Sequence, residues 1–292
     1  MEIDAANLQN LVQRQMFADP TEGIFNKRIM LQFFQMAQQS NMTEKERADV
    51  FDLLLVIALK FLSIWTHNQR YDKRERELIA ACEADPSDRR ENKPMRFESA
   101  QDLYIELDGF LVQCKSVLDH VCNILHYTMG ISFSSLNTFG DNGNKIIKIL
   151  KCNAPGPAKK AAKELIRFID DNQEWLKLMI DARDRMNHFS HGGIPVMSFG
   201  VACIIETDGV KKVHRPQMNP AQTVKEVMDM LLDNVLHFVE YFLGIALCVR
   251  MPGHGVKWNS SDDPTKPRWS VIPEVIIDQM LRTGQIDPRN IR

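Results

Sequence analysis

Apolar residues recur along most of the chain at the three- and four-residue spacing of amphipathic helices. Within 99–129 the spacing is a regular 3-4-3-4, typical of a bundle seam, at Leu111, Cys114, Leu118, Val121 and Leu125. Thr43 and Glu46 have the spacing of a capping box and mark a helix start. The pattern predicts an all-α helical bundle with helices over about 24–40, 43–80, 99–129, 144–151, 157–170, 172–188 and 219–251.

One segment departs from this helical pattern. Residues 199–215 contain two β-rich runs separated by Asp208-Gly209, a dipeptide typical of hairpin turns. The stretch 253–272 is polar, and a short final helix is expected over 273–282. We therefore expect a helical extension at 1–42, a bundle at 43–252 with one hairpin insertion at about 199–215, and a loosely packed C-terminal tail at 253–292.

Composition narrows the classes of partner. The 292 residues carry a formal net charge of −2, so the whole chain exerts no strong pull on nucleic acid or on an anionic membrane. An RNA partner would have to be held by a local patch. The most apolar runs, 52–66 and 229–251, are interrupted by charged residues and are interpreted as buried helices, so no membrane partner is expected.

The cysteine and histidine positions do not predict a metal or cofactor site. Six cysteines include no Cys-x-x-Cys pair, which favours free thiols in a cytoplasmic protein. Cys122 and His126 share a helix face, but a single pair of this kind is weak evidence for a metal site.

The segment 181–193 (DARDRMNHFSHGG) concentrates polar residues at the end of an amphipathic helix. Its inward stripe is Leu176, Met179, Ile180 and Met186. Arg183 lies one heptad after Leu176 and takes a position where the pattern requires an apolar residue. A half-buried arginine needs an anionic or polar partner, and local rules are broken most often at functional sites.

The polar residues of this segment also pair at helical spacing. Asp184 and His188 are four residues apart, so the carboxylate can orient the imidazole. Arg183 and Asn187 have the same spacing. Arg183 and His188, however, lie about 140° apart around an ideal helix. They converge only if the helix loosens at its end or if two chains share one site.

Arg183-Asp184-x3-His188 resembles the motif of HEPN domains, which is Arg-x4–6-His with a polar residue directly after the arginine. Arg185-x5-His191 is an overlapping match. The upstream segment 106–121 is similar to the helix that packs beside this motif in several HEPN groups, and it would supply Lys115 and Asp119 as polar partners. The resemblance covers roughly 43–252, and it implies a helical bundle of the HEPN type.

The resemblance further implies a metal-independent endoribonuclease, of the kind found in toxins and antiviral defence effectors. Arg183 would hold the phosphate, His188 would act as acid or base, and Asp184 would orient one or both. Supporting roles would fall to Asn187, His191, Arg185, Lys115 and Asp119. RNA would be the substrate, no cofactor is implied, and two chains would face each other in a homodimer. A regulatory protein partner is also expected.

Two other interpretations remain open from the residues alone. The chain could be a non-catalytic HEPN-like or generic helical module that binds a nucleotide or a protein partner in the same groove. Alternatively, the bundle is purely structural, and Arg183 forms a buried ion pair with an inward acid such as Glu106 or Asp119.

Overall fold

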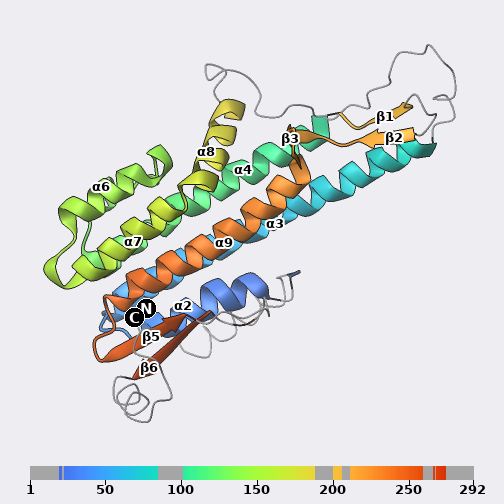
Figure 1. Cartoon of the computed structure of the whole chain (residues 1–292). Helices are drawn as coiled ribbons and strands as arrows, with labels where there is room; N and C mark the ends of the chain where they lie inside the picture. Colours follow the sequence, from blue (N-terminus) through green and yellow to red (C-terminus); the bar gives the residue numbers. More distant parts are fainter. Residues whose placement is uncertain are drawn as a thin grey trace, which may run out of the picture. The chain divides into compact units, whose positions relative to one another are not determined.

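The computed structural model confirms that the described part of the chain is mostly helical (Figure 1). It describes residues 20–21, 23–84, 101–187, 200–205, 211–258, 266 and 268–273. The helices are the π-helical turn η1 (Asn26–Leu31), α2 (Gln32–Gln38), α3 (Glu44–Ala84), α4 (Gln101–Val121), α5 (Ile124–Met129), α6 (Asn144–Asn153), α7 (Lys159–Asp171), α8 (Gln173–Asn187) and α9 (Val224–Cys248). Short 3-10 turns occupy Phe133–Ser135, Asp141–Gly143 and Gly156–Ala158.

The strands form three antiparallel two-stranded pairs, and the described residues contain no larger sheet. The predicted hairpin is confirmed as β1 (Ala202–Ile205) with β2 (Lys211–His214), while its Asp208-Gly209 turn lies outside the described residues. The other pairs are β3 (Gln217–Asn219) with β4 (Gln222–Thr223), and β5 (His254–Trp258) with β6 (Trp269–Pro273). The expectation of a single hairpin was therefore wrong.

The described part of the C-terminal tail forms a strand pair, which the sequence did not predict. Strands β5 and β6 lie within the predicted polar tail, and Trp269 of β6 is 5% exposed. Its backbone N–H donates to Gln32 Oε1 at 2.9 Å, and its indole N–H donates to the Glu240 carbonyl at 3.0 Å. These bonds attach the hairpin to α2 and α9. The short helix expected over 273–282 falls outside the described residues, except that Pro273 ends β6.

Two predicted helix boundaries differ from the structure. Helix α9 begins at Val224 rather than at Asn219, because Asn219 ends β3 and Pro220 and Ala221 form the turn that leads to β4. The helix start is set by a capping box, in which the Thr223 N–H donates to Glu226 at 2.8 Å and the Glu226 N–H donates to Thr223 Oγ1 at 3.2 Å.

The helix predicted over 99–129 is divided into α4 and α5. A turn at Cys122 and Asn123 separates them, and Gly130 ends α5 with a left-handed φ of 69°. The expected cap Ser99 lies outside the described residues. The capping box at the start of α3 is confirmed, because the Thr43 N–H donates to Glu46 Oε2 at 2.7 Å.

The chain divides into two compact units. Unit 1 comprises 1–62, 116–173 and 236–292. In its core Arg28 donates two hydrogen bonds to the Glu240 carboxylate, which is fully buried. Burial raises the pKa of Glu240, although the guanidinium of Arg28 opposes this shift. The segment that was expected as an N-terminal extension thus supplies η1 and α2 to the core of unit 1.

Unit 2 comprises 63–115 and 174–235, and its interior contains polar groups. Glu75 is fully buried and accepts a hydrogen bond from Arg215 Nη2 at 2.6 Å. Asn68 is 2% exposed and donates to Asp229 Oδ1 at 2.8 Å. Unit 2 also contains α8, and therefore the predicted motif.

Helix α9 is long and apolar enough to cross a membrane by length and composition. However, 72% of its most apolar window is buried inside the protein. The core helix of a folded bundle has the same two properties, as the sequence predicted for this run.

Candidate functional site

The predicted site lies at the C-terminal end of α8. Leu176, Met179 and Ile180 are buried, which confirms most of the predicted inward stripe, whereas Met186 is only half-buried. Arg183 follows this stripe, and 32% of its side chain is exposed. The arginine therefore combines an inward helical position with a guanidinium that solvent can still reach.

Arg183 makes a close contact with the residue that follows it. Its Nη1 donates to Asp184 Oδ1 at 2.5 Å, and the Asp184 side chain is also 32% exposed. This charge-assisted bond restricts both side chains. Asp184 was expected to orient Arg183, His188 or both. The structure describes its contact with Arg183, whereas His188 lies outside the described residues.

The rest of the motif is only partly described. Asn187 is the last residue of α8, and its side chain lies outside the described part. His188 and His191 also lie outside the described residues. Arg185 is exposed on α8. Arg183 and Arg185 thus differ clearly in environment, although both begin a match to the motif.

Lys115 and Asp119 both lie on α4, as predicted, but in different surroundings. Lys115 belongs to unit 2 and is 7% exposed. Asp119 belongs to unit 1, where its Oδ1 accepts the Phe139 N–H at 2.7 Å and the Thr138 hydroxyl at 3.2 Å. Asp119 therefore holds the loop that precedes α6, a structural role that its helical spacing did not predict.

In the purely structural interpretation, Glu106 was a possible ion-pair partner of Arg183. In the structure Glu106 Oε2 lies 2.7 Å from His67 Nδ1. The Glu106 carboxylate is thus already engaged with α3, and Arg183 forms its ion pair with Asp184.

The sequence interpretation missed a row of polar residues on α3 in the same unit. Asn68, Tyr71 and Glu75 are buried and follow one another at the spacing of a helix face. Apolar Ile64 and Leu78 continue the same row. The visible signal was an asparagine and a glutamate on an otherwise apolar stripe, the same kind of departure that singled out Arg183.

The arrangement at α8 suits the binding of an anion. A partly exposed guanidinium beside a carboxylate lies at this helix end. A guanidinium can bind a phosphate through paired N–H groups. Among the described residues, no group of three or more histidine, cysteine or acidic side chains is placed to hold a metal ion.

The chain was compared with known protein families, curated proteins and solved structures. No protein-family model, no curated protein and no solved structure matches this chain.

Proposed function

We propose that the chain is a metal-independent endoribonuclease of the HEPN type, acting as a toxin or an antiviral defence effector. The observation that carries this proposal is the environment of Arg183. It is half-exposed at the end of α8, bonded to Asp184, and precedes His188 by five residues in a mostly helical unit. Such a cation can stabilise the charge that develops on a reacting phosphate.

The reaction needs a base, an acid and a positive charge. A base removes the proton of the 2′-hydroxyl, and the 2′-oxygen then attacks the phosphorus. The bond from phosphorus to the 5′-oxygen breaks, an acid protonates this leaving oxygen, and a 2′,3′-cyclic phosphate remains. His188 is the proposed acid or base, because the ordinary pKa of an imidazole lies near neutrality. Arg183 holds the phosphate, and Asn187 supports it.

Asp184 is a positioning residue in this scheme. Its contact with Arg183 limits the directions in which the guanidinium can point. Fixing a charged donor before the reaction lowers the cost of reorganising it during the reaction.

A homodimer is part of the proposal, with RNA as its substrate and a regulatory protein as a further partner. Arg183 and His188 are about 140° apart on an ideal helix, so one chain does not readily aim both at one phosphate. Two copies that face each other would let the arginine of one chain serve the histidine of its partner. Symmetric pairs are also the commonest oligomers.

A non-catalytic binding module is the second candidate. It is favoured by the same contact, because Asp184 already occupies a guanidinium N–H of Arg183 and competes with an incoming phosphate. In this case the end of α8 binds a nucleotide or a protein partner without cleaving it.

Cleavage of mixed-sequence RNA in EDTA by Arg183→Ala and Arg185→Ala tests the proposal. Both variants lose one arginine of α8, but only Arg183 is half-buried and bonded to Asp184. Arg183→Ala should lower the rate by about 10²–10³-fold, as loss of a donor to a developing charge does. Arg185→Ala should stay near the wild-type rate. Equal rates in both variants would contradict the assignment of Arg183.

A further inference from the structure

We propose that α6 and α7 of unit 1 form a surface that binds the phosphate backbone of RNA. Residues 144–171 contain seven lysines and arginines and only three acidic residues, in a chain whose net charge is −2. We call the exposed cations of these two helices the basic face: Lys148, Lys151, Lys159, Lys160, Lys163 and Arg167.

Helical spacing aligns these cations. On α7, Lys160, Lys163 and Arg167 follow one another at three and four residues and lie on one stripe. The opposite stripe is buried through Ala162, Leu165 and Ile169. On α6, Lys148 and Lys151 are three residues apart, while the buried positions are Ile146, Ile147, Ile149 and Leu150.

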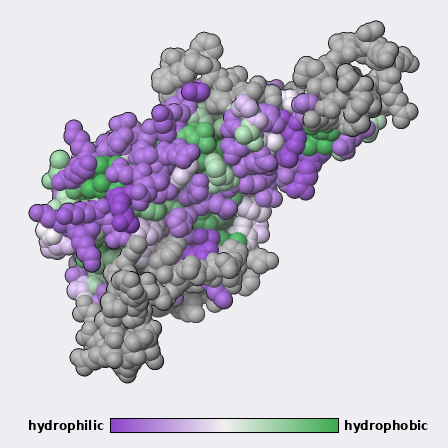
Figure 2. Space-filling model, in the orientation of Figure 1, coloured by the Kyte–Doolittle hydropathy of each residue, from purple (hydrophilic) through white to green (hydrophobic). Residues whose placement is uncertain are grey.

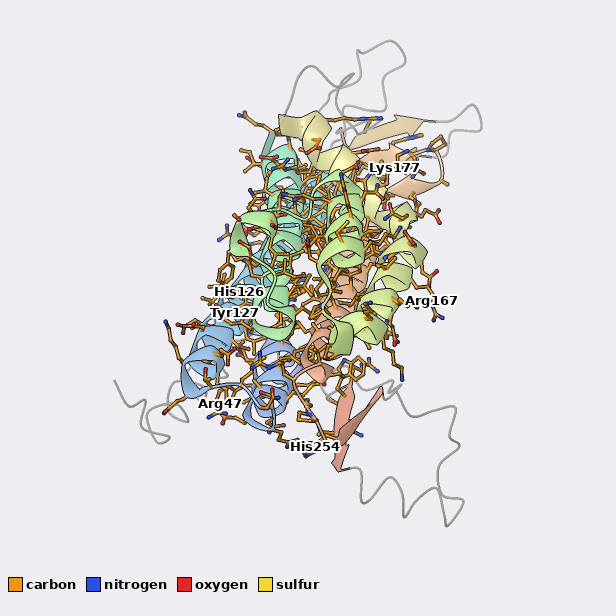
Figure 3. All side chains as sticks on the ribbon, turned by 90° about the vertical axis from the view of Figure 1, so that its left-hand side faces the viewer. Arg47, His126, Tyr127, Arg167, Lys177 and His254 are labelled. Carbon is orange, nitrogen blue, oxygen red and sulfur yellow. The ribbon has the colours of Figure 1, made fainter. Side chains whose placement is uncertain are left out.

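The figures agree with this orientation. Figure 3 shows Arg167 on α7 with its side chain directed away from the helices. Figure 2 shows hydrophilic residues over much of the surface in the region of α7. The two helices therefore bury one side and present a cationic side to solvent.

Most cations of the basic face have no acidic ion-pair partner among the described residues. Within the described part of the chain, its five lysines form no ion pair, and Arg167 forms one with the exposed Asp171 at 3.7 Å. The basic run at 70–76 on α3 is different, because Arg74 pairs with Glu77 and Asp102, and Arg76 pairs with Asp72. The basic face thus keeps a local positive field, whereas two of the four cations in the other run pair with acids.

Helix α7 is a rigid support for these charges. The Tyr241 hydroxyl on α9 donates to Glu164 Oε1 at 2.7 Å. The Tyr241 ring stacks on Phe168 with the ring centroids 4.2 Å apart. Because α7 is held on its inner side, the cations on its outer side have fixed spacing before any ligand binds, which lowers the ordering cost of binding.

The composition of the face favours nucleic acid over a lipid surface. Basic helices that lie on membranes combine their cations with exposed large apolar residues that insert between lipids. Among the described residues the exposed large apolar side chains are Val56, Leu59, Ile105 and Phe133, and none of them belongs to α6 or α7. A face of lysines without aromatic side chains suits contacts to phosphates that do not depend on base sequence.

The choice of RNA rests on the proposed function, whereas the binding surface does not depend on cleavage. The test therefore uses His188→Ala as the background, so that any nuclease activity cannot destroy the probe. Fluorescence anisotropy with a labelled single-stranded RNA is measured over a series of salt concentrations. Adding Lys160→Gln and Lys163→Gln to this background should weaken RNA binding. The slope of log K against log salt concentration should become less steep by about 1.4, because each phosphate that a lysine no longer neutralises contributes roughly 0.7.

Lys45→Gln with Lys73→Gln is the matched control. Both lysines are exposed on α3, so the same charge is removed from the chain and the basic face stays intact. The control should keep the affinity and slope of the background protein. An equal effect in both pairs, or no effect in either, would overturn the proposal. Binding to vesicles of phosphatidylcholine and phosphatidylserine without binding to RNA would also overturn it.

The two proposals can fail separately. RNA binding that depends on Lys160 and Lys163, without cleavage by the wild-type chain, would keep the basic face and end the nuclease proposal. Cleavage by the wild-type chain, with RNA binding unchanged after the Lys160 and Lys163 substitutions, would keep the nuclease proposal and end the basic-face proposal.

Discussion

Tyr71 carries a buried hydroxyl for which the structure describes no hydrogen-bond partner. The side chain is fully buried on α3, one helical turn before the buried Glu75. Burial raises the pKa of the Tyr71 hydroxyl, and the negative charge of Glu75 raises it further, so this tyrosine stays neutral. A buried polar group without a partner costs about 1–3 kcal/mol.

Tyr71→Phe should therefore raise the free energy of unfolding by about 1 kcal/mol, because it removes the hydroxyl and keeps the ring. Urea denaturation measures this change. Tyr241→Phe is the control, since the Tyr241 hydroxyl donates to Glu164 at 2.7 Å and its removal should be destabilising. If both variants are destabilised alike, the Tyr71 hydroxyl has a partner after all.

Helix geometry predicted the burial of individual site residues but not their contacts. The partial burial of Arg183 follows from its place one heptad after Leu176. Its contact with Asp184 does not, because adjacent residues on a helix normally point in different directions. The role of Asp119 depends on Phe139, which lies twenty residues further along the chain. Such a bond is set by tertiary packing and leaves no trace in local spacing.

Among the structural elements, α6 depends on Gly143 for the way it begins. This glycine lies at the end of a 3-10 turn with a φ of 91°, a conformation that side chains other than glycine rarely adopt. A methyl group there would lie 2.7 Å from Ile169 Cγ2 on α7 and 2.8 Å from the Phe139 ring. Glycine thus permits the close approach of α6 to α7, and with it the geometry of the basic face.

Gly143→Ala should lower the free energy of unfolding by about 1–3 kcal/mol, because it combines backbone strain with overpacking. Thermal unfolding followed by circular dichroism measures the decrease. Gly156→Ala is the matched control, since nothing lies within 4 Å of its added methyl group. Wild-type stability in Gly143→Ala would show that Phe139 and Ile169 move aside without cost.

Helices with a clear apolar stripe and local stop signals were predictable, as α6, α7 and α8 show. The break at Cys122 was not, because the apolar spacing continues across it to Leu125. The start of α9 was visible in Thr223 and Glu226, although the nearby Asn219-Pro220 suggested an earlier start. Strands β5 and β6 have little local signal, because Trp269 is held by Gln32 and Glu240 from distant parts of the chain.

Over the molecule as a whole, positive and negative side chains are unevenly distributed along the chain. A net charge of −2 coexists with seven cations against three acids in 144–171. Whole-chain composition therefore predicted that an RNA partner would need a local patch, but it could not place one. The position of the patch follows from the amphipathic phase of α6 and α7 and from the lack of close acidic partners for its lysines among the described residues.

The proposed assembly predicts complementation between two inactive variants. When Arg183→Ala and His188→Ala chains are coexpressed, a mixed dimer retains one composite site with both residues intact. About a quarter of the wild-type cleavage rate should return, since half of randomly formed dimers are mixed and each has one intact site of two. No recovery, with mixed dimers shown by native mass spectrometry, would contradict a site shared between chains.

The chemistry of the cleaved ends decides whether the chain is a metal-independent nuclease. Wild-type protein and His188→Ala are incubated with mixed-sequence RNA in EDTA, and the product termini are analysed. We predict 2′,3′-cyclic phosphate and 5′-hydroxyl ends from the wild type, and a rate about 10²–10⁴-fold lower from His188→Ala, as is typical when a general acid or base is removed. No cleavage by the wild type, or equal cleavage by His188→Ala, would contradict the nuclease proposal and leave the binding module in its place.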